Sequence, residues 1–309
     1  MLKPIITNKS YPSAIEVIDL LSSSLGIEDL ILLSDGRFSV GVPYNYPDQF
    51  MKYVFAAGKA YFLGNTVNYV LKNYSDKWDF QADVSDPSTQ LLNAIIDSTK
   101  RKLRESCDQI DKRLHTKTPA LIASSAALTR VIMTFRAAIL LVRNGFLFES
   151  ALMCRLILEQ LSWAYAIHDS RDNDFLKVLP TASISKTKKL IPYIAKLYGV
   201  LSKSSHISPE LTSDYIIKNK ADGGPYVLLK SPRSILHACH FLILADAFST
   251  VGVAMVKFSN RQMETDKSLN HKAKPSRQDS AFEFLKNHRK QIEALTGTDL
   301  DPLLKILST

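Results

Sequence analysis

PALIASSAALTRVIMTFRAAILLVRNGFLFESALMCRLILEQLSWAYAIHD, residues 119–169, consists of two long apolar segments on either side of Asn144-Gly145. Proline favours the first turn of a helix, and glycine favours the position just after its end. The stretch therefore predicts two helices, the second running from Phe146 to His168, that pack against each other as a hairpin. We expect this hairpin to form the centre of the molecule.

Charged residues interrupt the second of these helices, which is otherwise apolar on nearly all sides. It contains Glu149, Arg155 and Glu159, and a charge buried in apolar surroundings is costly unless an opposite charge pairs with it. Arg155 and Glu159 are four residues apart, so they share a helix face and can form an ion pair. This pair is either a salt bridge that satisfies itself or a charged group held beside a cleft. The sequence leaves open whether Glu159 pairs instead with Arg130 or Arg136.

The composition is that of an ordinary globular chain with an excess of positive charge. The 309 residues are 46% hydrophobic and 22% charged, with a formal net charge of +9, which excludes a disordered chain. Positive charge favours anionic partners such as nucleic acid, although solvated lysines and arginines account for it equally well. Three cysteines without paired spacing argue against a disulfide framework and a zinc site. Cys154 and Cys239 lie in apolar helical segments, so we expect buried thiols.

Two apolar segments, 119–142 and 234–256, are long enough to be checked as transmembrane helices. The first contains two arginines, and the second contains two histidines and an aspartate. Such groups are costly in a bilayer, so both segments are expected to be core helices of a soluble protein. The N-terminus lacks the apolar core of a signal peptide. We therefore expect a cytoplasmic protein that does not bind a membrane.

Residues 1–80 are expected to form a small N-terminal module of helices and one hairpin. A short helix is predicted over 11–25, and a longer, aromatic-rich helix is predicted over 48–74. Asp35-Gly36 lies between two β-prone segments, and this dipeptide favours the tight turn of a β-hairpin. A DNA-binding regulator is a third interpretation of this module, but it requires a further helix with a basic recognition face, which the sequence does not provide.

An acidic, polar break over 75–87 separates this module from a main helical bundle over 88–258. Besides the hairpin, the bundle contains a helix that begins near Ser88 and a long apolar helix from Arg233 to about 258. A basic linker and terminal helices follow over 259–309. Two segments with proline and polar residues are expected to be loops: 170–182 and 221–232. The predicted fold is mainly α, an antiparallel helical bundle with one small N-terminal β-hairpin.

Arg233, His237 and His240 stand at the beginning of the last long apolar helix. At about 100° per residue, they line one side of that helix. An arginine can hold a phosphate and a histidine can transfer a proton, as metal-independent RNA cleavage requires. The alternative is a set of polar residues on the outer face of the first turns. The two histidines have no third ligand nearby, so neither a metal nor a cofactor is predicted.

Other polar residues complete the set of candidates. His206 closes the polar segment Ser202-Lys-Ser-Ser-His and either folds back to support the site or is an ordinary exposed histidine. Six cations on two helical segments are candidates for contact with nucleic acid: Lys100, Arg101, Arg104, Lys186, Lys188 and Lys189. Acidic residues are interleaved with the first three, which is also typical of a solvated helix. No Walker or dinucleotide-binding loop, GxSxG, HExxH or kinase signature occurs.

The segment Leu141-Val-Arg-Asn-Gly-Phe-Leu-Phe-Glu-Ser-Ala-Leu-Met-Cys-Arg-Leu-Ile-Leu-Glu159 ends in Arg-x-x-x-Glu, and a Ser-x-x-x-His and another apolar helix follow it. Over 119–258 the chain thereby resembles uncharacterised bacterial helical proteins that are similar to the HEPN superfamily. HEPN proteins are helical bundles often found in toxin–antitoxin and anti-phage systems. Many are metal-independent RNases with an Arg and a His separated by four to six residues, and others are inactive binding partners.

The resemblance implies roles for particular residues. Six residues separate Arg233 from His240, and Ser234 occupies the position after the arginine, where a polar residue is usual. Arg233 is then expected to hold the scissile phosphate, while His240 transfers a proton. The supporting residues are His237, Arg155, Glu159 and His206. The resemblance also implies a homodimer or a partner protein, and a defence or toxin–antitoxin role as an endoribonuclease. The alternative is a non-catalytic interaction or nucleic-acid-binding protein within a defence complex.

Overall fold

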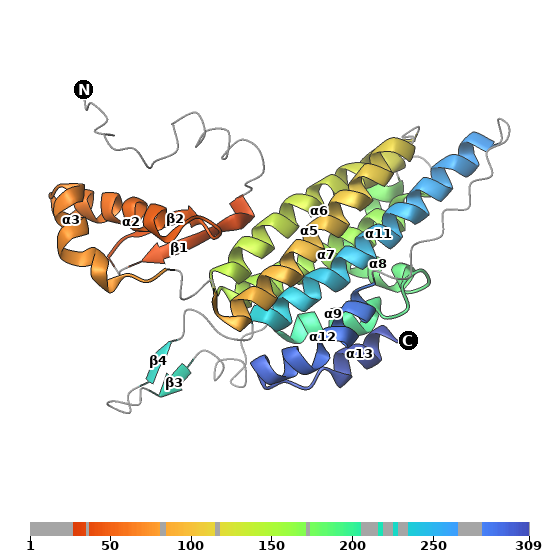
Figure 1. Ribbon diagram of the computed structural model, residues 1–309. Helices are drawn as coiled ribbons and strands as arrows, with labels where there is room; N and C mark the ends of the chain where they lie inside the picture. Colours follow the sequence, from red (N-terminus) through yellow and green to blue (C-terminus); the bar gives the residue numbers. More distant parts are fainter. Residues whose placement is uncertain are drawn as a thin grey trace, which may run out of the picture.

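The computed structural model describes residues 27–34, 37–80, 85–114, 118–170, 174–204, 216–218, 225–227, 234–264 and 280–308. Within them the fold is mainly α, a helical bundle with a small β-hairpin near the N-terminal end (Figure 1). This confirms the predicted fold class. The helix expected over 11–25, the Asp35-Gly36 dipeptide, Arg233 and His206 lie outside the described residues.

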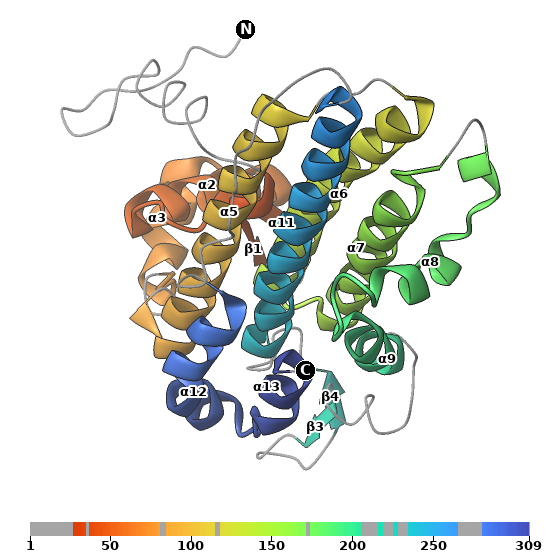
Figure 2. The same ribbon diagram turned by 90° about the vertical axis from the view of Figure 1, so that its right-hand side faces the viewer.

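Four long helices make up the bundle: α5 (Pro87–Arg113), α6 (Pro119–Arg143), α7 (Leu147–Ile167) and α11 (Ser234–Glu264). Side-chain caps define two of their starts. Asp86 accepts a hydrogen bond from the backbone N–H of Thr89 before α5, and Thr118 accepts one from Leu121 before α6. In both helices proline occupies the first turn. Backbone N–H groups there have no hydrogen-bond partner within the helix, so the N–H that proline lacks is not missed. Figures 1 and 2 show the four helices side by side.

The turn between α6 and α7 forms where the sequence predicts it. Asn144 caps the end of α6, and Gly145 adopts a φ of 80°, a left-handed conformation that glycine tolerates at little cost. The two helices then run antiparallel. The Ser124 hydroxyl of α6 donates to the carbonyl of Ala164 in α7 at 2.9 Å. Fully buried aromatic and aliphatic side chains fill the space between the helices, among them Phe135, Ile157, Leu161, Phe241 and Phe248.

Shorter helices cover the sides of the bundle. The helices α8 (Pro180–Thr187) and α9 (Ile194–Ser204) pack on α7, whereas α12 (Ala281–Thr296) packs on α11 and leads into α13 (Asp301–Leu307). The prediction of a loop over 170–182 is wrong at its end, because Pro180 begins α8 and η3 (Asp174–Lys177) precedes it. The strands β3 (Ile216–Lys218) and β4 (Pro225–Val227) form a second antiparallel pair that the sequence did not predict.

The N-terminal elements begin with η1 (Ile27–Asp29), which leads into the hairpin of β1 (Leu30–Ser34) and β2 (Ser39–Pro43). Helices α2 (Asp48–Leu63) and α3 (Val67–Tyr74) and the short η2 (Ser75–Lys77) follow. The hairpin was predicted, but the single helix over 48–74 is wrong. Gly64 has a φ of 66° and ends α2, and Thr66 caps α3. These elements have their own apolar cluster, in which the rings of Phe55 and Trp78 lie 4.9 Å apart.

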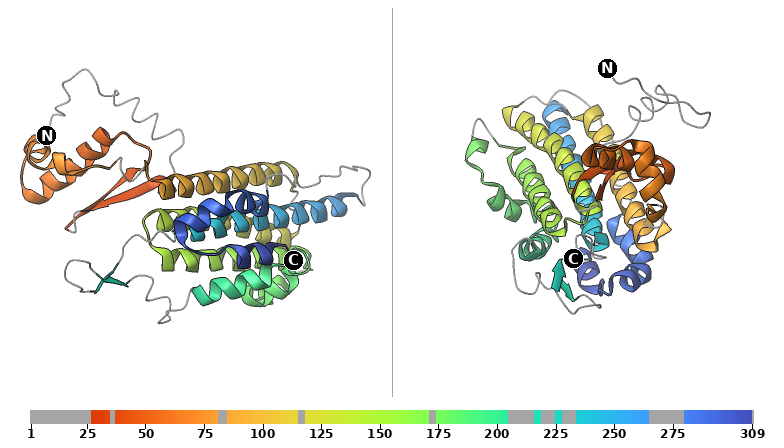
Figure 3. Two further views of the ribbon diagram at one scale, coloured as in Figure 1. Left: turned by 60° about the horizontal axis from the view of Figure 1, so that its bottom comes forward. Right: turned by 90° about the vertical axis from the view of Figure 1, so that its left-hand side faces the viewer.

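The N-terminal elements and the pair α8 and α9 lie on opposite sides of the four-helix bundle (Figure 3). Two helical stretches, Pro119–Arg143 and Ser234–Arg261, are apolar and long enough to cross a membrane. This is only a weak indication, since core helices of soluble proteins meet the same criteria. Among the 18 most apolar consecutive residues of each helix, 61% are buried in α11 but only 39% in α6. A smaller share of α6 than of α11 is therefore buried.

Candidate functional site

His237 and His240 lie one turn apart in the first two turns of α11. Their ring centroids are 6.1 Å apart and the ring planes are nearly perpendicular, at 89°. The Ser150 hydroxyl, in the first turn of α7, lies 3.4 Å from Nδ1 of His237. Ser150 and His237 thus bring the beginnings of α7 and α11 together, and His240 lies one turn further along α11. Arg233 would directly precede this helix, but it lies outside the described residues, as does His206.

His240 is the most perturbed of these groups. Its Nδ1 is buried and has no hydrogen-bond partner among the described residues, whereas the residue as a whole keeps part of its surface exposed. Burial disfavours the charged imidazolium and lowers the pKa of His240 to about 4. At neutral pH this imidazole is therefore uncharged and able to accept a proton, but its lowered pKa makes it a weaker base than an ordinary histidine.

Arg155 and Glu159 form a second polar group, on the side of α7 that faces α9. Arg155 Nε donates to Glu159 Oε1 at 3.0 Å, which answers the question of the partner of Glu159. Tyr198 of α9 joins them: its hydroxyl accepts from Arg155 Nη2 and donates to the same Glu159 oxygen, both at 3.1 Å. The hydrogen bond with Glu159 is the largest cause of the raised pKa of Arg155. The pair is half-buried, and its two hydrogen bonds with Tyr198 join α7 to α9.

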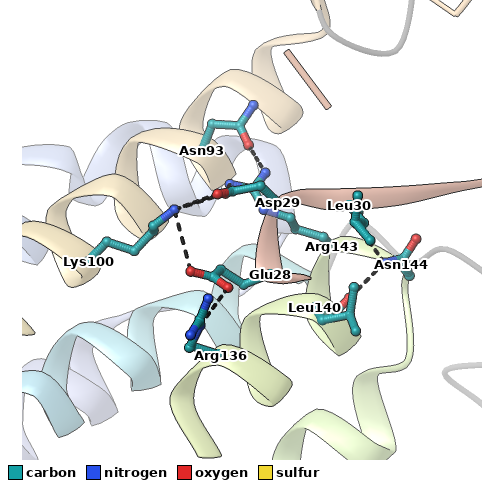
Figure 4. Close-up of polar contacts among 9 residues, drawn as sticks. All are labelled: Glu28, Asp29, Leu30, Asn93, Lys100, Arg136, Leu140, Arg143 and Asn144. Atoms are coloured by element: carbon teal, nitrogen blue, oxygen red, sulfur yellow. Dashed lines mark hydrogen bonds and ion pairs between the residues drawn. The ribbon is translucent and has the colours of Figure 1, made fainter. Parts of the chain in front are cut away.

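Glu149, the third charge of α7, is exposed, so the expectation of three buried charges in this helix is wrong. The buried charges lie elsewhere, where η1 meets the bundle (Figure 4). The Asp29 carboxylate receives hydrogen bonds of 3.0 and 2.8 Å from Lys100 of α5. Arg136 of α6 donates to Glu28 at 2.9 Å. No local pattern predicts this network, because its acids and its cations are about 70 or more residues apart.

Arg143 is the most deeply buried cation of this network, with 3% of its side chain exposed. Its guanidinium lies 3.9 Å from the ring centre of Tyr44, 3.7 Å from the Asp29 carboxylate, and donates to Asn93. Burial lowers the pKa of Arg143, while Tyr44 and Asp29 oppose that shift. The adjacent Asn144 accepts from the β1 backbone at Leu32, at 2.6 Å. Figure 4 shows these groups converging on η1 from α5 and α6, so the network fastens the hairpin to the bundle.

The six cations proposed to contact nucleic acid fall into two classes. Lys100 is paired with Asp29, and Lys186 donates to the Ala166 carbonyl and to Asp169, each at 2.7 Å. These two lysines already have partners within the chain. The remaining four are exposed and stay available to an anionic partner: Arg101, Arg104, Lys188 and Lys189.

Cysteines and metal ligands add no further chemistry to the described part of the chain. All three cysteines are free, and Cys154 and Cys239 are buried as expected. Burial raises the pKa of the Cys239 thiol to about 12, so it stays protonated and unreactive. Among the described residues no group of three or more histidine, cysteine, aspartate or glutamate side chains is arranged to hold a metal ion.

Comparisons with known proteins do not assign the chain to a family. No family model matches it, and no curated protein and no solved structure gives a match.

Proposed function

We propose that this protein is a HEPN-like, metal-independent endoribonuclease of a bacterial defence or toxin–antitoxin system, with its site at the beginning of α11. The observation that supports this most is the pair His237 and His240, one turn apart, with a serine of α7 at hydrogen-bond distance from the first. The two rings are close enough to serve one phosphodiester. The proposal places the protein in the cytoplasm with RNA as its partner.

The reaction would be an internal transesterification of RNA. Neutral His240 accepts the proton of a ribose 2′-hydroxyl as that oxygen attacks the adjacent phosphorus. The bond from phosphorus to the 5′ oxygen breaks, and His237 donates a proton to the leaving oxygen. Arg233, which directly precedes the helix, would hold the phosphate, as the resemblance implies. The products are a 2′,3′-cyclic phosphate and a 5′-hydroxyl, and no metal takes part.

Cleavage of total RNA in the presence of EDTA tests this proposal. We expect His240→Ala to lower the rate by about 10²–10⁴-fold, the usual contribution of a general base, and Arg233→Ala to be comparably impaired. His288→Ala is the matched control. This histidine lies on α12, where its ring stacks on Phe284, and its removal should leave cleavage unchanged. Products with 3′-hydroxyl ends, or cleavage that persists in His240→Ala, would reject the proposed mechanism.

A second candidate is a non-catalytic protein that binds nucleic acid within a defence complex. It is favoured by the four exposed cations Arg101, Arg104, Lys188 and Lys189, and by the burial of His240 Nδ1. In this case neither the wild type nor any variant cleaves RNA. Binding measured by mobility shift should instead weaken with rising salt. Arg101→Glu/Arg104→Glu should weaken it further, while Lys177→Glu, a change at an exposed lysine of η3, serves as the control.

A further inference from the structure

The outer face of the α6–α7 hairpin is apolar and exposed. Ile122 and Met133 of α6 are 55% and 57% exposed, and Leu152 and Leu156 of α7 are 39% and 38% exposed. Ile122 and Met133 are three helical turns apart, and Leu152 and Leu156 one turn apart, so each pair lies along one side of its helix. Single exposed apolar residues need no explanation, but a cluster on one face indicates a surface that another molecule covers.

The other sides of these two helices are occupied. Helix α11 packs on both α6 and α7, η1 packs on α6, and α8 and α9 pack on α7. Figures 2 and 3 show the N-terminal elements flanking the hairpin on one side and α8 and α9 on the other. The exposed apolar side chains thus belong to the one side of the hairpin that no described element covers. We call this surface, defined by Ile122, Met133, Leu152 and Leu156, the outer face.

Two unpaired charges of opposite sign border the outer face. Arg130 of α6 and Glu149 of α7 are both exposed, and neither forms an ion pair within the described part of the chain. By contrast, the neighbouring Arg136 pairs with Glu28, and Arg155 pairs with Glu159. Among the described residues, one cation and one anion on this surface of the hairpin therefore have no ion-pair partner.

The placement of the two charges is self-complementary. Since Ser124 lies opposite Ala164, Arg130 lies level with about residue 158 of α7, and Glu149 lies level with about residue 139 of α6. At 1.5 Å per residue the charges are separated by roughly 14 Å along the hairpin. Met133, Leu152 and Leu156 lie between them. Consider a two-fold axis that lies in the plane of the outer face, passes through the midpoint between the two charges and is perpendicular to the line joining them. Rotation about this axis brings Arg130 of one copy to the position of Glu149 of the other.

We propose that the outer face is the interface of a homodimer of this chain. In that dimer Arg130 of each copy meets Glu149 of the other, and the apolar side chains between them meet near the two-fold axis, as an isologous contact requires. An acidic partner would pair with Arg130 but repel Glu149, and a basic partner would do the reverse. A bilayer would remove both charges from water without pairing them. A second copy of the chain offers a partner of opposite charge to both Arg130 and Glu149.

This inference stands apart from the proposed ribonuclease activity. Ser150, which contacts His237, is two residues before Leu152, so the two point about 200° apart around α7. The dimer contact therefore does not use the histidine site. Loss of the dimer need not abolish cleavage, and absence of cleavage does not affect the dimer.

Charge exchange at the interface provides the test. Sedimentation velocity or light scattering of the wild type should give twice the 34.6 kDa mass of one chain. Arg130→Glu and Glu149→Arg each place like charges together twice per dimer, so each should raise the dissociation constant by more than about tenfold. The combined Arg130→Glu/Glu149→Arg variant restores the pairing with the signs reversed, and it should be dimeric again. Lys188→Glu, on the surface beside α8, is the control and should remain dimeric.

The outcomes separate the proposal from its rivals. Both charges are exposed, so circular dichroism should show folded protein for every variant. A wild type that is monomeric at all concentrations overturns the proposal. A monomeric wild type that binds phosphatidylglycerol vesicles also overturns it, because the outer face would then be a membrane-binding surface. A dimer that both single variants leave intact, or that the double variant fails to restore, shows that another surface forms it and equally overturns the proposal.

Discussion

The carboxylate of Asp29 is the group whose loss should most disturb the attachment of the hairpin to the bundle. Its side chain is 5% exposed, and it accepts two hydrogen bonds from Lys100 and lies 3.7 Å from Arg143. Asp29→Asn keeps the shape but removes the charge, so Lys100 keeps only the more distant Glu28 and Arg143 loses the carboxylate at 3.7 Å. Breaking a buried ion pair in this way costs about 3–5 kcal/mol. Lys100 keeps 24% exposure and Glu28 remains 3.8 Å away, so we expect about 3 kcal/mol.

Urea denaturation followed by circular dichroism measures this loss, and hydrogen exchange of the β1 backbone localises it. Faster exchange should appear in β1 and β2 before the core helices α7 and α11 respond. Asp174→Asn is the control, because its ion pair with Lys177 is 72% and 83% exposed and contributes almost nothing. A loss of stability under about 0.5 kcal/mol in Asp29→Asn, or unchanged exchange in β1, would refute the argument that this network fastens the hairpin.

Three further predictions concern single residues in the helices. Gly252→Ala should destabilise the protein by about 1–3 kcal/mol in urea denaturation, because its new Cβ would collide with the Ile110 side chain. A Cβ at Gly199 would meet open space, so Gly199→Ala should instead stabilise the protein by about 0.5–1 kcal/mol. Tyr198→Phe removes a hydroxyl that both accepts and donates, so it should lower stability by about 1 kcal/mol in the same assay. The pKa of His240 is about 4 when folded against 6.5 unfolded, so the unfolded chain binds more protons between these values and stability should fall as the pH drops from 6.5 towards 4. Burial lowers the pKa of His168 as well, so this dependence should weaken in thermal melts of His240→Gln without disappearing.

The helices of the bundle were predictable because their signals are local. Proline at 119, the Asn144-Gly145 dipeptide and the apolar runs fix the hairpin from a few neighbouring residues. The same reasoning failed at Gly64. A single glycine within an aromatic-rich helical pattern is tolerated in many helices, so the pattern alone does not reveal that it adopts a left-handed conformation and divides the segment into α2 and α3.

The burial of charges was not predictable in this way. Whether a charge is buried depends on which distant element covers it, and Lys100 is 71 residues from the Asp29 that it binds. The helix of Glu149 is apolar, yet this residue faces away from the core. For the candidate site, the spacing of His237 and His240 was evident from the sequence. The contribution of Ser150, 87 residues from His237, was not.

The most direct test of the proposed function compares single-turnover cleavage of total RNA, in EDTA, by the wild type and by His237→Ala/His240→Ala. Both histidines lie in the first turns of α11, so circular dichroism must show that the double variant retains its helical content. The proposal predicts cleavage by the wild type and a rate at least about 100-fold lower in the double variant. Equal rates for the two folded proteins would contradict it.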